Sequence, residues 1–310
     1  MLAFLCPGQG SQAPGFMAPW LELPSYAERI RYFSDFIGLD LGLHGTQSDA
    51  DTIRDTAIAQ PLIVAASMAS FFELWDDPKS FIPTNFAVAG HSVGEFAAAA
   101  IANVLSPKTA IEWVNARALA MAKAAAASSG SMAAVLGGDA ALVTAAIEAA
   151  GATAANINGA GQIVAAGPTL AIESLVATPP AGTRVVQLQV AGAFHSNQMQ
   201  PAVAELSAQI DTEGSQVSDP TSILLTNFDG SQVSSGAQFC NLMVGQIANS
   251  VRWDLCMQSL TDMGVSAVIE LSPAGTLAGL AKRGMPGIEI LALKTPDQID
   301  AAKDLIASHV

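Results

Sequence analysis

Cysteine and positive charge are scarce in this chain of 310 residues. The three cysteines, Cys6, Cys240 and Cys256, are odd in number and lack the spacing of metal ligands, so the sequence predicts reduced thiols and neither disulfides nor a metal site. Lysine and arginine number 13 against 27 acidic residues, which gives a formal net charge of −14. Nucleic acid and membranes are therefore not expected as partners, because a concentrated basic surface would be needed to bind either.

Uninterrupted apolar runs long enough to cross a membrane are also lacking, although 51% of the residues are hydrophobic. The uncharged stretch at 149–172 is broken by Asn156, Asn158, Gln162 and Pro168, so it predicts no membrane span. The first seven residues have neither the basic start nor the cleavage site of a signal peptide, and they fit a buried strand. We therefore expect a cytoplasmic protein, a monomer, with room for one large domain and a smaller one.

Short apolar runs alternate with helical patterns towards both ends of the chain. A helix is predicted at 95–103, directly after one of these runs. The predicted strands lie at residues 2–6, 86–89, 222–227, 267–271 and 288–293. This alternation is typical of an α/β fold with a mainly parallel sheet covered by helices.

The middle of the chain follows another order, β-α-β-β-α-β. The predicted elements are strands at 132–136, 153–157, 162–166 and 184–190, with helices at 139–150 and 169–176. This order is the ferredoxin-like supersecondary pattern. We therefore expect a ferredoxin-like domain at residues 127–192, inserted into an α/β-hydrolase-like catalytic domain made of residues 1–126 and 193–310.

The segment Gly90-His91-Ser92-Val93-Gly94 fits the pattern G-x-S-x-G between a predicted strand and a predicted helix. Glycines are needed in such a turn because the backbone crowds it on both sides. The turn presents the Ser92 hydroxyl beside a helix N-terminus, whose free N–H groups can stabilise an oxyanion. A plain glycine-rich turn is the alternative, but the flanking strand and helix favour a nucleophile.

A serine nucleophile needs a base, and the chain contains four histidines. His309 lies beside the C-terminus, where we expect fraying, and His44 lies in a polar loop without further support. His91 is adjacent to Ser92, so its side chain is expected on the opposite side of the turn. His195 follows a predicted strand, and the loop there could carry it to the nucleophile. His195 is therefore the favoured base, and a structural histidine is the alternative.

A carboxylate that would complete a catalytic triad is not visible in the sequence. Between Ser92 and His195, the acids Asp139, Glu148 and Glu173 fall in the predicted helices of the inserted domain. The imidazole is therefore expected to be oriented by a backbone or amide oxygen, which makes the site a dyad.

Arg117 projects from the apolar face of a helical pattern at 110–122, with Trp113, Val114 and Met121 three or four positions away. A guanidinium seldom stays buried without an anion, so we expect either a structural carboxylate or an acidic ligand beside it. A bidentate pair with a carboxylate would select an acyl group that ends in one. From the residues alone, a structural pair is the preferred interpretation.

Taken together, four motifs in order resemble the malonyl-CoA:acyl-carrier-protein transacylases. The first of these motifs, at residues 8–12, follows the first predicted strand. By itself it is only a tight loop, which could bring a backbone N–H towards an oxyanion. The similarity also includes the segments 246–253 and 270–277 and runs along essentially the whole chain. The four motifs are Gly8-Gln9-Gly10-Ser11-Gln12, Gly90-His91-Ser92-Val93-Gly94-Glu95, Arg117, and Ala193-Phe194-His195-Ser196.

This resemblance implies roles for five residues in catalysis. Ser92 is acylated, His195 is the general base, and Gln246 orients His195 through its backbone oxygen. The backbone N–H groups of Gln9 and Val93 form the oxyanion hole. Orientation of His195 by the backbone oxygen of Gln246 agrees with the absence of a triad carboxylate from the sequence.

The same resemblance implies the substrate site and the partners. Arg117 forms a salt bridge to the malonyl carboxylate, which reverses the preference for a structural pair. Phe194 beside the base and Val93 after the nucleophile fit selection of malonyl over methylmalonyl groups, and Met121 is placed in the same pocket. Malonyl-CoA and an acyl carrier protein are the implied partners, with the coenzyme A thioester as substrate and no cofactor.

Three other interpretations of the sequence stay open. A serine hydrolase, an esterase or thioesterase, would use the same turn and release free acid without an acceptor. A malonyl transferase subunit of a malonate decarboxylase or polyketide system would use the same residues, and a carrier-binding subunit with a decayed site is the non-enzymatic alternative. The arginine and the absent acid argue against the hydrolase, and the intact serine, histidine and arginine argue against decay.

Overall fold

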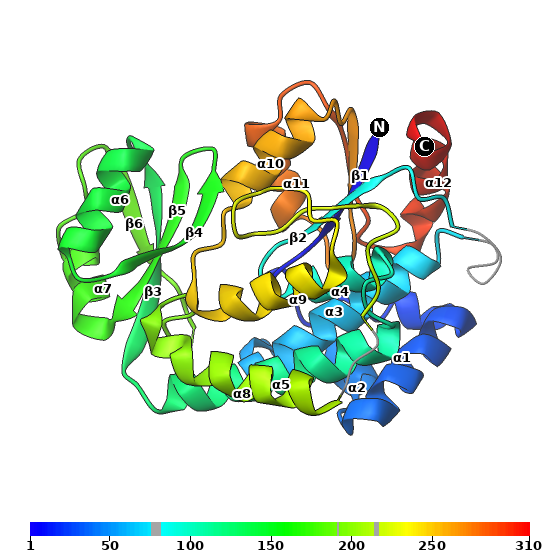
Figure 1. Ribbon diagram of the computed structural model, residues 1–310, viewed down its shortest axis with the longest axis horizontal. Helices are drawn as coiled ribbons and strands as arrows, with labels where there is room; N and C mark the ends of the chain where they lie inside the picture. Colours follow the sequence, from blue (N-terminus) through cyan, green and yellow to red (C-terminus); the bar gives the residue numbers. More distant parts are fainter. Residues whose placement is uncertain (76–81, 191, 214–216) are drawn as a thin grey trace.

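The computed structural model describes residues 1–75, 82–190, 192–213 and 217–310, so residue 191, near the expected domain boundary, lies outside the described residues. Figure 1 shows two separate sheets: a parallel sheet surrounded by most of the helices, and a smaller sheet with α6 and α7 beside it. The α/β class with a mainly parallel sheet, expected from the sequence, is confirmed.

The larger sheet has five parallel strands in the order β7-β2-β1-β8-β9. Its central strand, β1, consists of five apolar residues, and all of them are buried because helices cover both faces of the sheet. The strand bounds are β1 Leu2–Cys6, β2 Ala87–Gly90, β7 Ile223–Leu224, β8 Ala267–Glu270 and β9 Glu289–Ala292.

The helices around this sheet include α3, which is buried on nearly all sides, and α5, the longest. Their bounds are α1 Pro24–Ile37, α2 Leu41–Thr46, α3 Thr56–Phe72, α4 Gly94–Ile101, α5 Pro107–Ala126, α8 Gln200–Glu213, α9 Gly236–Gly245, α10 Trp253–Asp262, α11 Thr276–Gly284 and α12 Ile299–His309, with 3-10 turns η1 Trp20–Glu22, η2 Thr52–Arg54, η3 Asn197–Met199, η4 Gln246–Ala248 and η5 Pro296–Gln298. In the described part of the chain, no helix combines the length and apolar character that a bilayer crossing requires.

The strand predicted at 222–227 is much shorter in the structure, where β7 covers only Ile223–Leu224. The chain leaves the sheet because Leu225 pairs with Gln232 in an isolated antiparallel bridge, and the Thr226 N–H donates to the Ser231 carbonyl. The turn that results carries the next residues towards the end of β2, where they join the site described below.

The smaller sheet is antiparallel, with strand order β4-β5-β3-β6. Apolar residues on one face of β3 and β5 pack with α6 and α7 in a separate core cluster, while residues on the other face, such as Met132 and Val164, join the main core. The predicted order β-α-β-β-α-β is present as β3 Gly130–Gly137, α6 Ala140–Ala149, β4 Thr153–Gly159, β5 Gln162–Pro168, α7 Thr169–Ala177 and β6 Thr183–Gln187.

The edge strand β4 of the smaller sheet pairs with the segment that precedes α10. The N–H of Val251 donates to the carbonyl of Ala155 at 2.8 Å, and the N–H of Ile157 donates to the carbonyl of Val251 at 2.9 Å. Val251 precedes α10, which packs beside the larger sheet. This connection holds the polar end of β4 over the carboxyl ends of β1 and β2, where the candidate site lies.

Candidate active site

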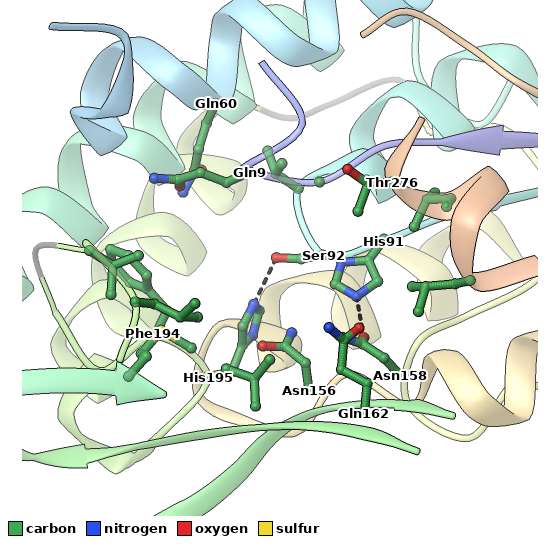
Figure 2. Close-up of a pocket in the computed structure, with 18 of the residues that line it drawn as sticks. Gln9, Gln60, His91, Ser92, Asn156, Asn158, Gln162, Phe194, His195 and Thr276 are labelled. Atoms are coloured by element: carbon green, nitrogen blue, oxygen red, sulfur yellow. Dashed lines mark hydrogen bonds between the residues drawn. The ribbon is translucent and has the colours of Figure 1, made fainter. Parts of the chain in front are cut away.

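Ser92 occupies a tight turn between β2 and α4. Its φ of 53° is in the left-handed region, which a residue with a side chain seldom adopts. Glycines on both sides make room for it: a Cβ on Gly90 would lie 2.1 Å from the carbonyl carbon of Gly94, and a Cβ on Gly94 would lie 2.2 Å from the carbonyl oxygen of Cys6. The spacing G-x-S-x-G is thus a steric requirement of this turn, and the turn leaves the Ser92 hydroxyl facing the cavity (Figure 2).

Asn227, which no sequence motif marks, fixes this turn from the loop that follows β7. Its Oδ1 accepts the Ser92 N–H at 2.7 Å, and its Nδ2 donates to the Gly90 carbonyl at 2.7 Å. The side chain is fully buried. It satisfies two backbone groups that the sharp turn removes from regular structure, and such a contact across 135 residues leaves no local pattern in the sequence.

The structure brings His195 to Ser92. The Nε2 atom of His195 lies 2.7 Å from Ser92 Oγ, and the Nδ1 atom lies 2.8 Å from the backbone oxygen of Gln246. Since that oxygen can only accept, Nδ1 carries the proton and Nε2 is left as an acceptor for the serine hydroxyl. His195 also has a positive φ, 58°, so both members of the pair depend on an uncommon backbone conformation.

The environment of His195 keeps its ring neutral. Burial lowers the pKa of His195 to about 3, and the positive charge of Arg117 acts in the same direction. A ring with this pKa is unprotonated at neutral pH and is available to take a proton from Ser92.

Gln246 connects the base, the nucleophile turn and the arginine. Its backbone oxygen accepts from His195, its Oε1 accepts from Arg117 Nη2 at 3.1 Å, and its Nε2 donates to the Ser92 carbonyl at 3.1 Å. The same Nε2 donates to the Glu95 carboxylate at 2.5 Å. From the sequence, a role is predicted only for the backbone oxygen of Gln246, because the side-chain contacts depend on the fold.

Arg117 is fully buried beside the nucleophile. Its Nη2 lies 3.3 Å from Ser92 Oγ, and its Nη1 donates to the Gln60 amide oxygen at 2.6 Å. Within the described residues, no carboxylate forms an ion pair with this guanidinium, and its Nε has no hydrogen-bond partner. Burial lowers the pKa of Arg117 to about 10, and the Glu95 carboxylate opposes that shift. A buried cation held mainly by neutral amides can still bind an anion.

A cavity of about 200 Å³ opens in front of Ser92 (Figure 2). The predicted residues Gln9, Val93, Phe194 and Met121 line it, while Arg117 and Gln246 lie behind that lining. A polar wall faces Ser92 from the smaller sheet, formed by Asn156, Asn158 and Gln162. The cavity therefore lies between the two sheets and has room for a small acyl group with an extended polar chain behind it.

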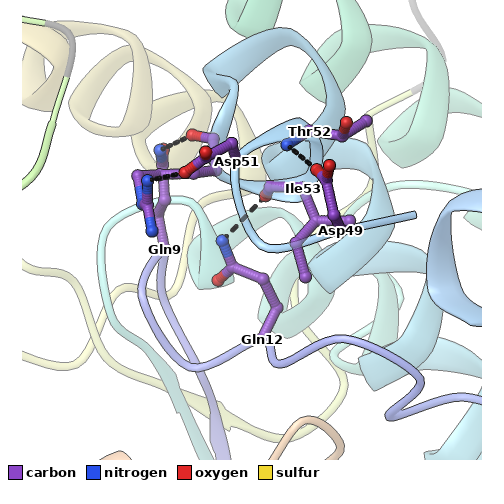
Figure 3. A network of polar contacts seen from close by, with 7 residues as sticks. Gln9, Gln12, Asp49, Asp51, Thr52 and Ile53 are labelled. Atoms are coloured by element: carbon purple, nitrogen blue, oxygen red, sulfur yellow. Dashed lines mark hydrogen bonds and ion pairs between the residues drawn. The ribbon is translucent and has the colours of Figure 1, made fainter.

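The loop after β1 is held in place by its glutamine side chains (Figure 3). Gln9 Nε2 donates to the Arg54 carbonyl at 3.3 Å, and Gln12 Nε2 donates to the Ile53 carbonyl at 3.0 Å. In the described part of the chain, the backbone N–H groups of Gln9 and Val93 have no acceptor. Both residues line the cavity, so these donors are available to an oxyanion formed next to Ser92.

The other histidines differ partly from what the sequence predicted. The side chain of His91 does not leave the opposite side of the turn; it lines the same cavity as Ser92, because the left-handed φ of Ser92 breaks the alternation that neighbouring side chains have in extended backbone. Its Nε2 lies 2.8 Å from the Asn158 side chain, and burial lowers its pKa. His309 ends α12 and lies 2.9 Å from Ser266 Oγ, so the expected fraying is wrong. His44 contacts Ser48 at 2.9 Å and lies in α2 instead of a loop.

Among the described residues, no group of three histidine, cysteine or acidic side chains could hold a metal ion. The three cysteines are buried and unpaired. Burial raises the pKa of each thiol, to about 11 for Cys240. These thiols are inert at neutral pH, so the reactive groups of the cavity are those around Ser92.

Comparison with known proteins gives a likeness over nearly the whole chain. The acyl transferase domain family matches residues 3–301. The malonyl CoA-acyl carrier protein transacylase of Mycobacterium tuberculosis (strain ATCC 25618 / H37Rv) is 45% identical over 308 residues, which cover 98% of this chain and 100% of that protein. The crystal structure of MCAT from Mycobacterium tuberculosis gives a TM-score of 0.92 at 44% identity, covering 98% of this chain and 99% of that chain. The structure of a malonyl-transacylase in complex with its type II PKS acyl-carrier protein gives a TM-score of 0.88 at 28% identity, covering 98% of this chain and 99% of that chain.

Proposed function

Because the chain belongs to the acyl transferase domain family, and within it to the malonyl CoA-acyl carrier protein transacylases, we propose that it acts through an ester on Ser92. The enzyme is an acyltransferase: a malonyl group passes from coenzyme A to the phosphopantetheine thiol of an acyl carrier protein. The observation that carries the proposal is the convergence on Ser92 Oγ of His195 Nε2 at 2.7 Å and Arg117 Nη2 at 3.3 Å. A base and a cation beside one hydroxyl suit transfer of an anionic acyl group.

In the first half-reaction, Ser92 Oγ attacks the thioester carbon and gives its proton to His195 Nε2. The hydrogen bond from His195 Nδ1 to the Gln246 carbonyl supports this direction, because it leaves Nε2 free. The carbonyl oxygen becomes an oxyanion and accepts from the N–H groups of Gln9 and Val93. When the C–S bond breaks, His195 returns the proton to sulfur, and coenzyme A leaves as a thiol.

The second half-reaction runs in reverse with another thiol. The phosphopantetheine thiol gives its proton to His195 and attacks the ester carbon, and the C–O bond to Ser92 breaks as His195 reprotonates the serine. Water must be excluded while the ester exists, and the enclosing walls from both sheets support this. The coenzyme A thioester is consumed as a substrate, and no cofactor takes part in these steps.

Arg117 is the proposed anchor for the free carboxylate of the malonyl group. One methylene separates that carboxylate from the carbon bonded to Ser92 Oγ, and Arg117 Nη2 is 3.3 Å from this oxygen, so both ends can be held together. Gln60 lines the cavity in front of the guanidinium, and its amide oxygen is the group that a carboxylate would replace. An uncharged acyl group gains nothing from this exchange, which gives selectivity for acids.

The walls of the cavity fit the proposed preference for an unbranched acyl group. Phe194 beside the base, Val93 after the nucleophile and Met121 behind them all line the space next to Ser92. A methyl branch on the acyl group would press against the Phe194 ring. We also propose an inserted ferredoxin-like unit at residues 127–192 within an α/β-hydrolase-like domain, which the strand order β4-β5-β3-β6 of the smaller sheet supports.

The test is acylation followed by transfer. The full chain is incubated with malonyl-CoA, and mass spectrometry of its peptides should find one malonyl group on Ser92, while a Ser92→Gly variant gains none. Added carrier protein bearing phosphopantetheine should then become malonylated. A label on another residue would overturn the nucleophile assignment. Fast release of free malonate without carrier protein would instead support the hydrolase, which shares the same turn.

Fatty acid synthesis is the proposed context, and polyketide assembly and malonate decarboxylation are the alternatives because they use the same transfer. Carrier proteins from the three systems distinguish them when each is offered at equal concentration. The proposal expects the fatty acid carrier to be malonylated with the highest kcat/KM.

A further inference from the structure

Glu95 is a buried acid next to the reacting groups for which the mechanism above has no use. It lies in the first turn of α4, three residues after Ser92, and its side chain is fully buried. Its Oε1 accepts the Asn227 N–H at 2.7 Å, and its Oε2 accepts Gln246 Nε2 at 2.5 Å. Glu95 is not part of the cavity wall, so any effect on the substrate must pass through another residue.

That residue is Arg117. A single amide separates the two charges, because Gln246 donates to Glu95 with Nε2 and accepts from Arg117 with Oε1. The direct partners of the guanidinium are uncharged oxygens of Gln60, Gln246 and Ser92. The charge that stabilises the guanidinium electrostatically is that of Glu95. The net charge available to a ligand of Arg117 therefore depends on whether Glu95 is ionised.

Glu95 is a group that can change its charge near neutral pH. Burial raises the pKa of Glu95 to about 8, against the opposing effects of Asn227, Arg117 and Gln246. The titratable groups that face it are Arg117 from α5 and Cys256 from α10. Burial raises the pKa of the Cys256 thiol far above neutral pH, and the pKa of Arg117 is about 10. Between pH 7 and 9, Glu95 is thus the group of this cluster whose charge changes most.

We propose that Glu95 is a specificity-determining positioning residue, whose carboxylate competes with the carboxylate of the incoming acyl group for the positive charge of Arg117. The inference rests on the proposed function, because it requires an anionic acyl group at Arg117. With Glu95 protonated, the substrate meets an uncompensated cation. With Glu95 ionised, the substrate carboxylate meets an Arg117–Glu95 pair without net charge. Its binding then leaves two carboxylates and one guanidinium in the same buried cluster.

Competition of this kind links substrate binding to a proton. An anion bound at Arg117 disfavours the charged form of Glu95 and raises its pKa, so the protein takes up a proton when the acyl carboxylate binds. Above the pKa of free Glu95, that proton must come from solution, and binding weakens as pH rises. A rise of about one in the pKa of Glu95 on binding corresponds to about a tenfold loss of preference for the anionic substrate.

The experiment compares Ser92 acylation by malonyl-CoA and acetyl-CoA at pH 7 and pH 9. The ratio of the two kcat/KM values removes any effect of pH on the nucleophile, on His195 or on coenzyme A, since both substrates share them. For the unaltered chain, with the pKa of Glu95 rising from about 8 to about 9 on binding, we expect this ratio to fall about fivefold between pH 7 and pH 9. In Glu95→Gln it should stay constant. The control Glu148→Gln, an exposed acid on α6, should retain the fall.

A second measurement does not depend on the folding of Glu95→Gln. Calorimetric titration of Ser92→Gly with malonyl-CoA and with acetyl-CoA at pH 8, in buffers of different ionisation enthalpy, reports the protons taken up on binding. Malonyl-CoA should take up more protons than acetyl-CoA. Equal uptake, or a fall of the kcat/KM ratio in Glu95→Gln as large as in the unaltered chain, overturns the inference. Failure of the unaltered chain to form any malonyl ester would instead refute the proposed function, which the acylation assay detects separately.

Discussion

Replacement of Arg117 by alanine tests the proposed anchor most directly. The change removes donors to the amide oxygens of Gln60 and Gln246, at 2.6 and 3.1 Å, and a contact to Ser92 Oγ at 3.3 Å. Truncating one member of a buried charge pair costs roughly 2–5 kcal/mol. At about 1.4 kcal/mol per factor of ten, kcat/KM for malonyl-CoA is expected to fall between roughly thirtyfold and a few thousandfold.

The contact between Arg117 and Ser92 Oγ means that every substrate loses something in this variant. The expected signature is therefore a change in ratio: malonyl-CoA loses at least tenfold more than acetyl-CoA. For malonyl-CoA, kcat/KM of Arg117→Lys should lie between the values of the unaltered chain and of Arg117→Ala. Lysine keeps the charge but cannot present the planar pair of donors that matches a carboxylate.

The assay is single-turnover acylation of Ser92, with the ester quantified by mass spectrometry at several substrate concentrations. Lys123→Ala is the matched control, because Lys123 lies on the same helix, α5, and its side chain is 73% exposed in a surface pair with Glu205. That variant should behave like the unaltered chain. An equal loss for malonyl-CoA and acetyl-CoA in Arg117→Ala would refute the anchor and leave Arg117 with a structural role only.

Acylation by acetyl-CoA is expected to stay constant from pH 7.5 down to pH 5, because the pKa of His195 lies near 3 and the base is lost only as pH falls towards that value. A histidine with the ordinary pKa of about 6.5 would lose about thirtyfold by pH 5, and a loss of that size in quenched-flow measurements would contradict the buried, neutral base. The variant Gly94→Ala is expected to lower the free energy of unfolding by about 3 kcal/mol, since the added Cβ would lie 2.2 Å from a backbone oxygen of Cys6. Urea denaturation measures it, with Gly279→Ala in α11, where the nearest atom is 3.9 Å away, as a control that should lose no stability.

The fold class and the nucleophile turn could be predicted because their signals are local. Alternating apolar runs give the parallel sheet, and glycines two positions either side of Ser92 mark the turn, since a side chain on either would collide with backbone. The placement of His195 relied on few candidates and on a family resemblance. Its φ of 58° could not be expected for a histidine from sequence alone.

The residues that support the site could not be predicted, because their partners lie far away in the chain. Asn227 contacts residues 135 and 137 positions earlier, and Gln60 meets Arg117 across 57 positions. Glu95 ends the second family motif, but nothing in the sequence assigns it a role, which becomes visible only once its burial and its contact with Gln246 are known. The error at His91 has a different origin: neighbouring side chains point to opposite sides only in extended backbone, and the left-handed φ of Ser92 could not be expected from the sequence.

The left-handed backbone at position 92 implies that the nucleophile lowers the stability of the fold. An L-residue with a Cβ is disfavoured there by roughly 1–2 kcal/mol relative to glycine. The catalytically silent Ser92→Gly chain should consequently melt at a higher temperature than Ser92→Ala. Ser92→Gly is thus the better variant for crystallising the protein with an unreacted thioester. Selection for stability alone would favour glycine over serine at this position.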